Sequence, residues 1–424
     1  MDLSLQVGKY DIKKLLGKGA TGTVYLAVDT FSGAQVALKV IEPEVFSDPE
    51  FGAVHRSQFL NEASLAGKLK HPYIVGILDA VVLEDSGHIA MELVTGGDLS
   101  QHVDPKKLLP IPDVLQIGFK CCGALDYASR EGVIHRDIKP ANIMIAHGTD
   151  VKIADFGAAL LRKSHVLQKT ASIGSPYYMS PEQIENKPAT LHSDMYCLGV
   201  SLYELLTGHK PFAASSLESL TQKILIQEPT PPSKVRAGLS REIDVVVLRA
   251  IAKKPEHRYG TWAEFALALS TLGQKLLPPD AIPDSEKYVS LKKVTMLSGL
   301  SDAELWELVR AGKWTRVAAN KTIVRENEKG KSFFFLAKGR VKVVRQGRLL
   351  NMIDERECFG EMGYIRGGEI PRHATVESAS EIELAEFDPD ALARMSLGTQ
   401  LQLTRALVGN LVDRLELANS RLLR

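Results

Sequence analysis

Hydrophobic and polar residues alternate in short runs near the start of the chain, as in TGTVYLAV, QVALKVI and HIAMELV. Because successive side chains of a strand point to opposite faces of a sheet, these runs predict an antiparallel sheet over residues 8–95. One stretch inside it, RSQFLNEASLAGKLK, is helical in character. From about residue 110 to 270 the apolar positions follow a helical spacing, and loops rich in proline and glycine separate the segments. The pattern predicts an α+β protein that begins with a sheet-rich part and continues with a helical one.

A further structural part is predicted after residues 273–288, GQKLLPPDAIPDSEKY, whose three prolines and weak apolar periodicity indicate a linker. Ser301 is placed to cap a short helix, SDAELWELVRAG. Alternating strands with glycine-centred turns follow from Trp314 to Phe387, a pattern typical of an antiparallel barrel. The last helix, over 399–423, repeats apolar residues at three- and four-residue steps, so it either packs on the barrel or pairs with a second copy.

Length and charge narrow the class of protein. A chain of 424 residues is too long for one core and predicts two or three domains. The formal net charge of +1 provides no overall basic field for nucleic acid or an anionic membrane. No apolar run reaches the roughly 20 residues that span a bilayer, and the start lacks the basic-then-apolar order of a signal peptide. We therefore expect a cytoplasmic protein with neither nucleic acid nor membrane as a partner. The four cysteines lack zinc-ligand spacing and are expected to be small buried hydrophobes.

The stretch LGKGATGTVYLA places Gly17, Gly19 and Gly22 between two strands. Positions without side chains let backbone N–H groups close over phosphate oxygens, although glycine turns are also common in ordinary hairpins. In the next strand, VALKV, Lys39 is flanked by apolar residues. An inward lysine there requires an anion, whereas a surface lysine on an edge strand is the alternative. Glu62, on the helical stretch of this region, is the candidate ion-pair partner of Lys39.

Two loops further along the chain carry the residues that phosphoryl transfer requires. In VIHRDIKPANIMI, Asp137 and Asn142 lie five residues apart, and in VKIADFGAA, Asp155 comes directly after a strand. Asp137 suits the group that accepts the hydroxyl proton, whereas Asn142 and Asp155 offer oxygen ligands for magnesium. Lys139 is placed to neutralise the phosphate that is transferred. An interpretation as turn-forming residues fails because every part appears in the required order.

With this ordered series the chain resembles the eukaryotic-type protein kinase family over residues 8–270, with an N-lobe over 8–95 and a C-lobe over 96–270. The resemblance rests on GKGATGTV, VALK, HRDIKPAN, DFG, SPE and SDMYCLGVSLYELLTG, and the DIKPAN form is similar to serine/threonine kinases. It implies an enzyme that uses ATP with Mg²⁺ or Mn²⁺ to phosphorylate protein substrates. A catalytically dead scaffold is the remote alternative, because the catalytic series is complete. The resemblance also implies ATP contacts at Val24, an adenine border at Met91, a ribose contact at Asp98, a Glu182–Arg258 pair and a brace of the catalytic loop at Asp194.

The segment between DFG and SPE carries candidate sites of control by phosphorylation. Thr170 and Ser172 lie where kinases of this family are phosphorylated, and Arg136, beside Asp137, is placed to bind such a phosphate. Solvent-exposed hydroxyl groups without such a role are the competing interpretation. We expect regulation at Thr170 and Ser172.

Residues 289–424 resemble the cyclic nucleotide-binding domain, a family that includes protein kinase A regulatory subunits and bacterial catabolite-activator proteins. The resemblance rests on FGEMG and PRHATV and implies a jelly-roll-like β-roll with flanking helices. In such a pocket Arg372 would offer a guanidinium fork to the cyclic phosphate, and the short Ala374 would let the phosphate approach the backbone. Glu361 would accept a hydrogen bond from the ribose 2′-hydroxyl, and Gly360 would leave room and a free N–H.

Two departures from that family's pattern bear on the pocket. Between Glu361 and Arg372 the chain has two residues more than is usual, so IRGGEI is expected to bulge the phosphate loop. The residue after the arginine is usually Ala or Thr, but here it is His373, whose imidazole could stack on the base, donate a hydrogen bond or block the pocket. The choice between cAMP and cGMP stays open, and so does a barrel that binds no nucleotide and serves as a dimerisation or docking module.

Together these features predict a serine/threonine kinase that a cyclic nucleotide regulates within the same chain. A ligand shifts only an equilibrium between states that it binds unequally, so the barrel or the final helix would contact the kinase in one state. By analogy with related fusions, activation is the expected sign. A homodimer through the final helix is a further candidate, although Thr404 interrupts its apolar stripe.

Overall fold

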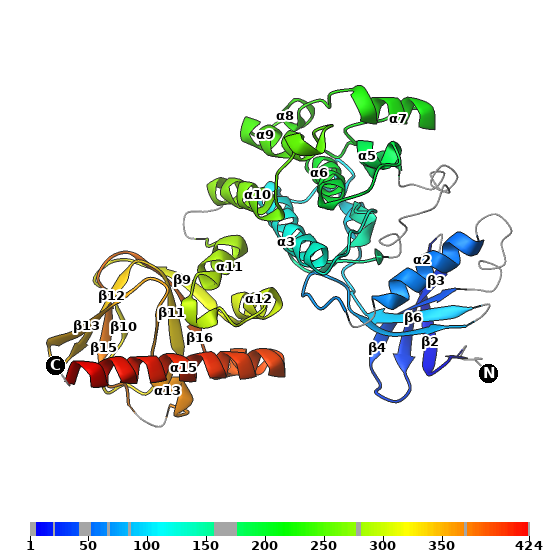
Figure 1. Ribbon diagram of the computed structural model, residues 1–424. Helices are drawn as coiled ribbons and strands as arrows, with labels where there is room; N and C mark the ends of the chain where they lie inside the picture. The colour runs from blue at the N-terminus through cyan, green and yellow to red at the C-terminus, as the bar shows by residue number, and fades with distance from the viewer. Residues whose placement is uncertain are drawn as a thin grey trace. The chain divides into compact units, whose positions relative to one another are not determined.

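The computed structural model describes residues 6–19, 22–41, 52–65, 68–83, 86–156, 176–276, 281–368 and 371–422. The chain divides into two compact units, Met1–Leu276 and Leu277–Arg424. Figure 1 shows a sheet and a helical part in the first unit, and strands with flanking helices in the second. The α+β fold class predicted from the sequence is confirmed.

The first unit opens with a six-stranded antiparallel sheet in the order β1-β2-β3-β4-β6-β5. Its strands are β1 (Gln6–Val7), β2 (Tyr10–Gly19), β3 (Gly22–Asp29), β4 (Gln35–Ile41), β5 (Ile77–Val82) and β6 (Gly87–Glu92). Alternation along β4 distributes side chains between two cores. Val36 and Leu38 pack with Tyr10 on one face, whereas Ile41 packs with Phe59 of helix α2 (Gly52–Ser64) on the other. The predicted sheet and its inserted helix are both present.

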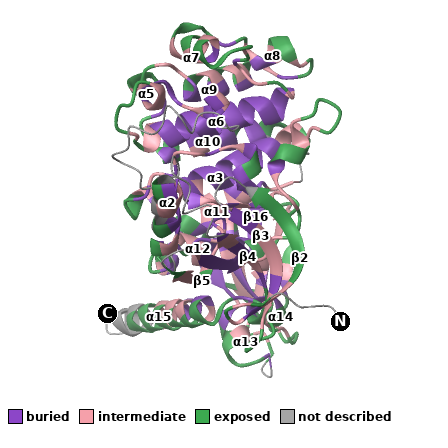
Figure 2. Ribbon diagram, turned by 90° about the vertical axis from the view of Figure 1, so that its right-hand side faces the viewer, coloured by how far each residue is buried: buried purple, intermediate pink, exposed green. Residues whose placement is uncertain are grey.

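Helices make up most of the rest of this unit. The central helix α3 (Ile111–Arg130) packs against both α6 (Leu191–Thr207) and α10 (Trp262–Leu276). Every residue of α6 from Ser193 onward is buried, including the charged Asp194 and Glu204. Figure 2 shows these helices as a buried layer. Shorter elements surround them: η1 (Leu99–His102), η4 (Pro176–Tyr178), α5 (Pro181–Ile184), α7 (Leu217–Ile226), α8 (Pro232–Val235), α9 (Arg241–Ala250) and η5 (Pro255–His257).

A two-stranded hairpin between α3 and α6 supports the loops that matter most for function. It consists of β7 (Ile143–His147) and β8 (Asp150–Ile153), and the short η2 (Pro140–Asn142) leads into it. Val75 donates its backbone N–H to the carbonyl of Ile153 at 2.9 Å, which joins the end of β8 to the segment before β5. The first residues after β8, Ala154 and Asp155, are therefore held beside the sheet.

Both ends of the segment that the sequence predicted as a linker are helical. Helix α10 runs to Leu276, and α11 (Asp284–Lys292) belongs to the second unit. Tyr288 of α11 stacks on Trp306 of α12 (Asp302–Ala311), with ring centroids 4.5 Å apart. The interpretation of 273–288 as a linker therefore included residues of two helices. Its three prolines and few apolar positions gave α11 little periodic signal.

The second unit contains two four-stranded sheets, in the orders β10-β15-β12-β13 and β14-β11-β16-β9. Their strands are β9 (Lys313–Val317), β10 (Thr322–Val324), β11 (Phe333–Lys338), β12 (Arg340–Arg345), β13 (Arg348–Asp354), β14 (Cys358–Phe359), β15 (Thr375–Ser378) and β16 (Ile382–Phe387). Both sheets contribute to one core, in which Val341 and Val376 from the first pack with Phe334 and Leu384 from the second. The chain adds η6 (Thr295–Leu297), α13 (Glu361–Ile365), α14 (Pro389–Ala393) and α15 (Leu397–Leu422).

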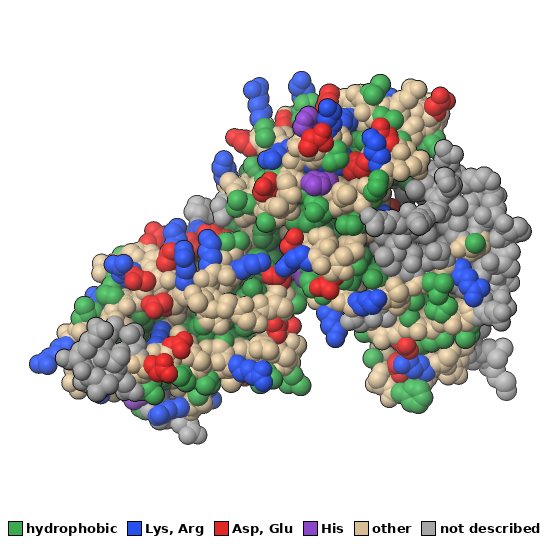
Figure 3. Space-filling view, in the orientation of Figure 1, with side chains coloured by type: hydrophobic (Ala, Val, Ile, Leu, Met, Phe, Trp, Pro, Cys, Tyr) green, Lys and Arg blue, Asp and Glu red, His purple; other side chains and the backbone are tan. Residues whose placement is uncertain are grey.

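The burial of the cysteines and the mixed charges of the surface agree with what the composition predicts. All four cysteines are free and buried, and burial raises the pKa of Cys121 and of Cys358 to about 12, as expected for inert core thiols. Figure 3 shows acidic and basic side chains interspersed over both units, in keeping with a net charge of +1. Within the described part of the chain, no helix has the length and apolar character needed to cross a membrane.

Candidate functional site

The register of three strands places Gly17, Val24 and Lys39 in one row. Gly17 pairs with Val24 across β2 and β3, and Val24 pairs with Lys39 across β3 and β4. A Cβ at Gly22 would lie 2.5 Å from the carbonyl oxygen of Val40, and its φ of +146° also requires glycine. At Gly17 a Cβ would meet no heavy atom within 4 Å. The fold therefore explains Gly22 but not Gly17, and the open space at Gly17 fits the approach of a ligand. Gly19 pairs with Gly22 at the end of the hairpin.

Lys39 is buried at 7% exposure and lies between two carboxylates from distant parts of the chain. Its Nζ is 2.7 Å from Oε2 of Glu62 on α2 and 3.4 Å from Oδ1 of Asp155. Lys39 in turn lowers the pKa of Asp155. Burial alone would lower the pKa of Lys39, but Asp155 and Glu62 outweigh it and raise that pKa. The interpretation of Lys39 as a surface lysine is wrong, and the predicted pair with Glu62 is present.

The loop around Asp137 is held by several hydrogen bonds. Lys139 Nζ lies 2.6 Å from Asp137 Oδ2, and Nδ2 of Asn142 donates to the same oxygen at 3.1 Å and to the Asp137 carbonyl at 2.8 Å. Buried Asp194 on α6 accepts from the backbone N–H groups of His135 and Arg136 at 2.8 and 2.7 Å. Those two bonds hold Arg136 in a left-handed conformation with φ +70°. The three side chains predicted to cluster here, Asp137, Lys139 and Asn142, are in contact.

Asn142 and Asp155 are brought together by the backbone. The N–H of Ala154 donates to the carbonyl of Asn142 at 2.8 Å, so Asp155 is the next residue after this link. The Asp155 side chain is 45% exposed, and its backbone has φ +61°. Since Asn142 uses Nδ2 on Asp137, its Oδ1 is the atom left for a cation.

These two residues can be tested for their fit to a divalent cation. The described residues include no group of three His, Cys, Asp or Glu side chains that could hold a metal ion by themselves. Mg²⁺ beside a nucleotide takes one or two protein oxygens and fills its other positions with phosphate oxygens and water. Asn142 and Asp155 supply such a partial set, so the residues fit the ion.

Other residues implied by the kinase resemblance lie around this centre. Met91 is buried in the core beneath α2, near the end of β6. Asp98 caps η1 by accepting from the N–H of Ser100 at 2.8 Å, so one of its oxygens is already used. Thr170 and Ser172 lie outside the described residues.

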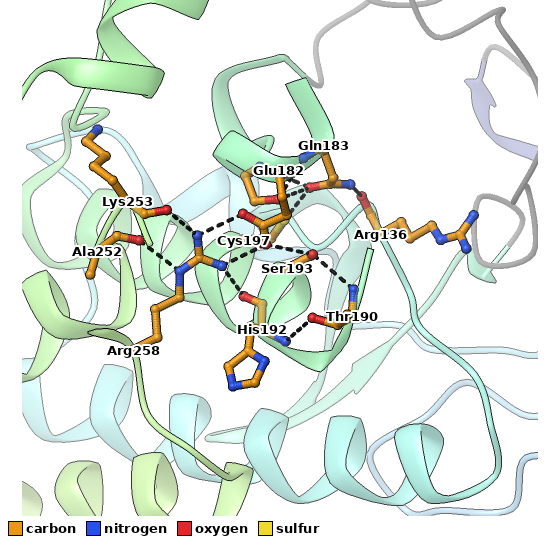
Figure 4. Close-up of polar contacts among 11 residues, drawn as sticks. Arg136, Glu182, Gln183, Thr190, His192, Ser193, Cys197, Ala252, Lys253 and Arg258 are labelled. Carbon is orange, nitrogen blue, oxygen red and sulfur yellow. Dashed lines mark hydrogen bonds and ion pairs between the residues drawn. The ribbon is translucent and has the colours of Figure 1, made fainter. Parts of the chain in front are cut away.

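The predicted Glu182–Arg258 pair is bidentate and buried (Figure 4). Nη1 and Nη2 of Arg258 lie 2.8 and 2.9 Å from the two carboxylate oxygens, and Ser193 Oγ donates to Oε1 at 2.7 Å. Arg258 also donates to three backbone carbonyls, those of Ala252, His192 and Lys253. This network ties α5 to the helical core below it.

In the second unit the predicted carboxylate has a partner that the sequence did not reveal. Gly360, with φ +81°, precedes α13, and Glu361 is its first residue with 5% exposure. Nη1 of Arg414, on α15, lies 2.9 Å from Glu361 Oε1, and its Nη2 donates to the carbonyl of Cys358 at 2.6 Å. The one available signal was position, because Arg414 follows buried Leu407 by seven residues and so lies on the same side of the helix.

Arg372 donates to the backbone rather than to Glu361. Its Nη1 reaches the carbonyl of Gly360 at 2.9 Å, and its Nη2 reaches that of Ser332 at 2.6 Å. The guanidinium lies in a glycine cradle, formed by Gly330, Gly360 and Gly363. A Cβ at any of the three would come within 2.6 to 2.9 Å of a guanidinium nitrogen. Burial lowers the pKa of Arg372.

The remaining residues of this pocket lie at its surface. His373 is exposed and Ala374 is half-buried. In the stretch IRGGEI, which is expected to bulge the phosphate loop, Gly367 and Gly368 have positive φ, and residues 369–370 lie outside the described residues. The sequence marked Gly330 as the centre of a turn and Gly363 as the last residue of FGEMG, but it did not reveal that both face Arg372.

Comparisons with known proteins agree with both predicted families. Residues 10–268 match the protein kinase domain, and residues 314–397 match the cyclic nucleotide-binding domain. The chain is 37% identical over 328 residues to serine/threonine-protein kinase PknB of Mycobacterium leprae, a match that covers 73% of this chain and 52% of that protein. It is 36% identical over 288 residues to PknB of Mycobacterium tuberculosis, covering 66% and 45% of the two chains. A probable serine/threonine-protein kinase of Corynebacterium efficiens is 38% identical over 290 residues, covering 66% and 43%.

The chain thus spans about half the length of the curated relatives that it matches. Residues 10–268 match the protein kinase domain and the relatives are serine/threonine-protein kinases, so the prediction made from the ordered motifs is confirmed. The chain belongs to the protein kinase family, with a serine/threonine kinase domain similar to that of PknB followed by a cyclic nucleotide-binding domain.

Proposed function

We propose that this chain transfers the γ-phosphoryl group of ATP to serine or threonine hydroxyl groups of proteins. The observation that carries the proposal is the meeting of Lys39, Glu62 and Asp155 from three distant parts of the chain. An ion pair of buried groups costs desolvation, so the presence of this one beside the partly exposed Asp155 is better explained by a charged substrate than by stability alone.

In this reaction Asp137 orients the substrate hydroxyl and accepts its proton as the new P–O bond forms. At the same time the bond between the γ-phosphorus and the β–γ bridging oxygen breaks, and ADP leaves. Lys139, 2.6 Å from Asp137, neutralises charge on the phosphoryl group that is transferred. Lys39, fixed by Glu62, binds phosphate oxygens of the nucleotide, and the glycine turn at Gly17, Gly19 and Gly22 covers them. A divalent cation, Mg²⁺ or Mn²⁺, held by Asn142 Oδ1 and Asp155 would supply further positive charge.

The Asp137→Asn variant tests this proposal. Incorporation of radioactive phosphate into the chain itself and into a generic basic protein is measured with ATP and Mg²⁺. The variant should lose at least 100-fold in rate, because the amide accepts no proton. Phosphoamino-acid analysis should find phosphoserine or phosphothreonine. Incorporation that stays at background in wild type and variant alike would mean a catalytically dead scaffold.

We propose further that the second domain binds a cyclic nucleotide, cAMP or cGMP, and that binding activates the kinase. Support comes from the cradled guanidinium of Arg372, the glycine-led turn into Glu361 and the short Ala374 beside them. Calorimetry with each nucleotide tests binding, and phosphorylation rates with and without saturating nucleotide test activation. Tight binding with unchanged rates would refute the regulation but leave the binding intact.

A second candidate role for this domain is dimerisation, and the exposure of α15 favours it. Leu403 and Leu407 are buried on one side of the helix. Its other side exposes a stripe of apolar residues between 48% and 83%: Leu397, Leu401, Val408, Val412 and Leu415. Because these recur at steps of three, four and seven, they fit pairing with α15 of a second copy. In sedimentation velocity, Leu401→Glu with Leu415→Glu should convert a dimer to a monomer, and a monomeric wild type would refute the role.

A further inference from the structure

Gln183 links the start of α5 to the peptide bond that precedes Asp137. Its Nε2 donates to the backbone carbonyl of Arg136 at 2.9 Å, although 47 residues separate the two in sequence. In Figure 4 this bond joins Gln183 to the backbone of Arg136, whose guanidinium points away from the Gln183 amide. Through this bond Gln183 therefore contacts the backbone of the catalytic loop and not one of its side chains.

The two ends of this peptide group are held separately. The Arg136 carbonyl accepts from Gln183, and the N–H of Asp137 donates to His135 Nδ1 at 3.3 Å. Arg136 has φ +70°, a strained value for a residue with a side chain, so the surroundings must hold it in place. Asp194 holds the N–H of Arg136, but within the described residues Gln183 is the side chain that holds its carbonyl.

The amide of Gln183 is itself fixed. Its Oε1 accepts from the backbone N–H and from the hydroxyl group of Ser180 at 3.0 Å each, and from the Cys197 thiol at 3.6 Å. These contacts complete a capping box at the start of α5 and set which way the amide nitrogen points. The adjacent residue, Glu182, is anchored by Arg258. A glutamine locked in this way is a donor of fixed direction.

We propose that Gln183 is a positioning residue for Asp137, which it orients through the Arg136–Asp137 peptide bond. The proposal rests on the kinase activity proposed above. Through Gln183, any displacement of α5 changes the peptide plane from which the Asp137 side chain extends, without contact between Gln183 and substrate.

The variant Gln183→Glu separates positioning from capping. Glutamate serves as well as glutamine at this capping position, so α5 keeps its capping box. The carboxylate, however, cannot donate to the Arg136 carbonyl and repels it. We expect kcat to fall roughly tenfold while the KM for ATP changes less than about twofold, because the nucleotide contacts lie elsewhere.

The pH profile adds a readout that a structural role would not move. The ratio of kcat for Gln183→Glu to that of wild type should rise as the pH falls, since the protonated carboxyl regains a donor. Gln222→Glu, the same change at an exposed position of α7, is the matched control and should keep kcat and its pH profile. If Gln183 only caps α5, Gln183→Glu will match wild type, and the proposal is overturned.

Hydrogen exchange measured by mass spectrometry decides the question without activity. Peptides covering residues 134–142 should exchange faster in Gln183→Glu than in wild type or Gln222→Glu, while peptides of α6 stay unchanged. Absence of phosphate transfer by wild type above an Asp137→Asn background would refute the kinase activity itself, and exchange would then decide the positioning. Unchanged hydrogen exchange in the loop would overturn the positioning role of Gln183.

Discussion

The charged residues of the two candidate sites have different kinds of partner. In the kinase domain the predicted residues meet one another: Lys39 contacts both Glu62 and Asp155. In the cyclic nucleotide-binding domain, Arg372 instead donates to two backbone carbonyls, and Glu361 pairs with Arg414 from α15. A nucleotide entering the first site joins an assembled group of charges. A nucleotide bound at the second site would have to join or replace contacts that Arg372 and Glu361 make within the chain.

The largest effect is expected from a change that disrupts the kinase site. Replacing Lys39 with methionine removes the cation that Glu62 and Asp155 share, and we expect phosphate incorporation to fall by about 100- to 1,000-fold. The two carboxylates left behind also cost stability, so thermal unfolding should be recorded beside the activity. Lys106→Met, at an exposed position, is the control and should leave both unchanged. Retained activity in Lys39→Met would show that the assembled charges are structural.

The corresponding change in the second site is Arg372→Ala. We expect affinity for the cyclic nucleotide to fall roughly 100-fold in calorimetry, because the charge-assisted contacts to the phosphate are lost. Arg372→Lys keeps the charge but not the guanidinium fork, so its affinity should lie between those of wild type and Arg372→Ala. Arg325→Ala removes an exposed arginine of the same barrel and should bind as wild type does. Undiminished binding by Arg372→Ala would assign its guanidinium to the fold alone.

The difference between the two sites also explains what the sequence could predict. Most of the kinase residues were predictable because they lie in short motifs of fixed spacing, and alternation predicted the strands that carry Val24 and Lys39. The placing of Gly17, Gly19 and Gly22 between two strands was wrong, because the ladder of β2 and β3 continues through all three glycines. Arg414 was missed because it lies 53 residues from Glu361 and in no motif. The acceptors of Arg372 were missed for a different reason, since backbone carbonyls have no sequence signature. Helix α11 was missed because its burial involves few apolar positions.

Removing Arg414 should destabilise the second domain. Glu361 is 5% exposed, and Arg414 supplies the cation that lies 2.9 Å from its carboxylate. A buried carboxylate that loses its cation is costly, so Arg414→Ala should lower the free energy of unfolding by about 2 kcal/mol.

Urea unfolding of the full chain, followed through the transition of the second domain, measures this loss. Arg340→Ala breaks an ion pair with Asp354 that is 59% exposed on both sides, and it should cost under about 0.5 kcal/mol. Adding Glu361→Gln to Arg414→Ala should recover most of the loss, because no buried charge remains. An undiminished loss in the double variant would show that Arg414 acts through its hydrogen bond to the Cys358 carbonyl and not through Glu361.

The smallest expected effect concerns the glycine cradle around Arg372. A Cβ at Gly363 would lie 2.6 Å from Arg372 Nη1 and 2.7 Å from the carbonyl oxygen of Gly330, and the second of these is backbone that cannot turn aside. Gly363→Ala should therefore displace the guanidinium and weaken cyclic nucleotide binding about tenfold. Gly409→Ala is the control, because a Cβ there meets nothing within 4 Å on helix α15 and should raise stability without changing affinity. If Gly363→Ala binds as wild type does, the Arg372 guanidinium must bind its ligand from outside the glycine cradle. The hydrogen bonds of Arg372 to the carbonyls of Gly360 and Ser332 would then be ones that the ligand replaces.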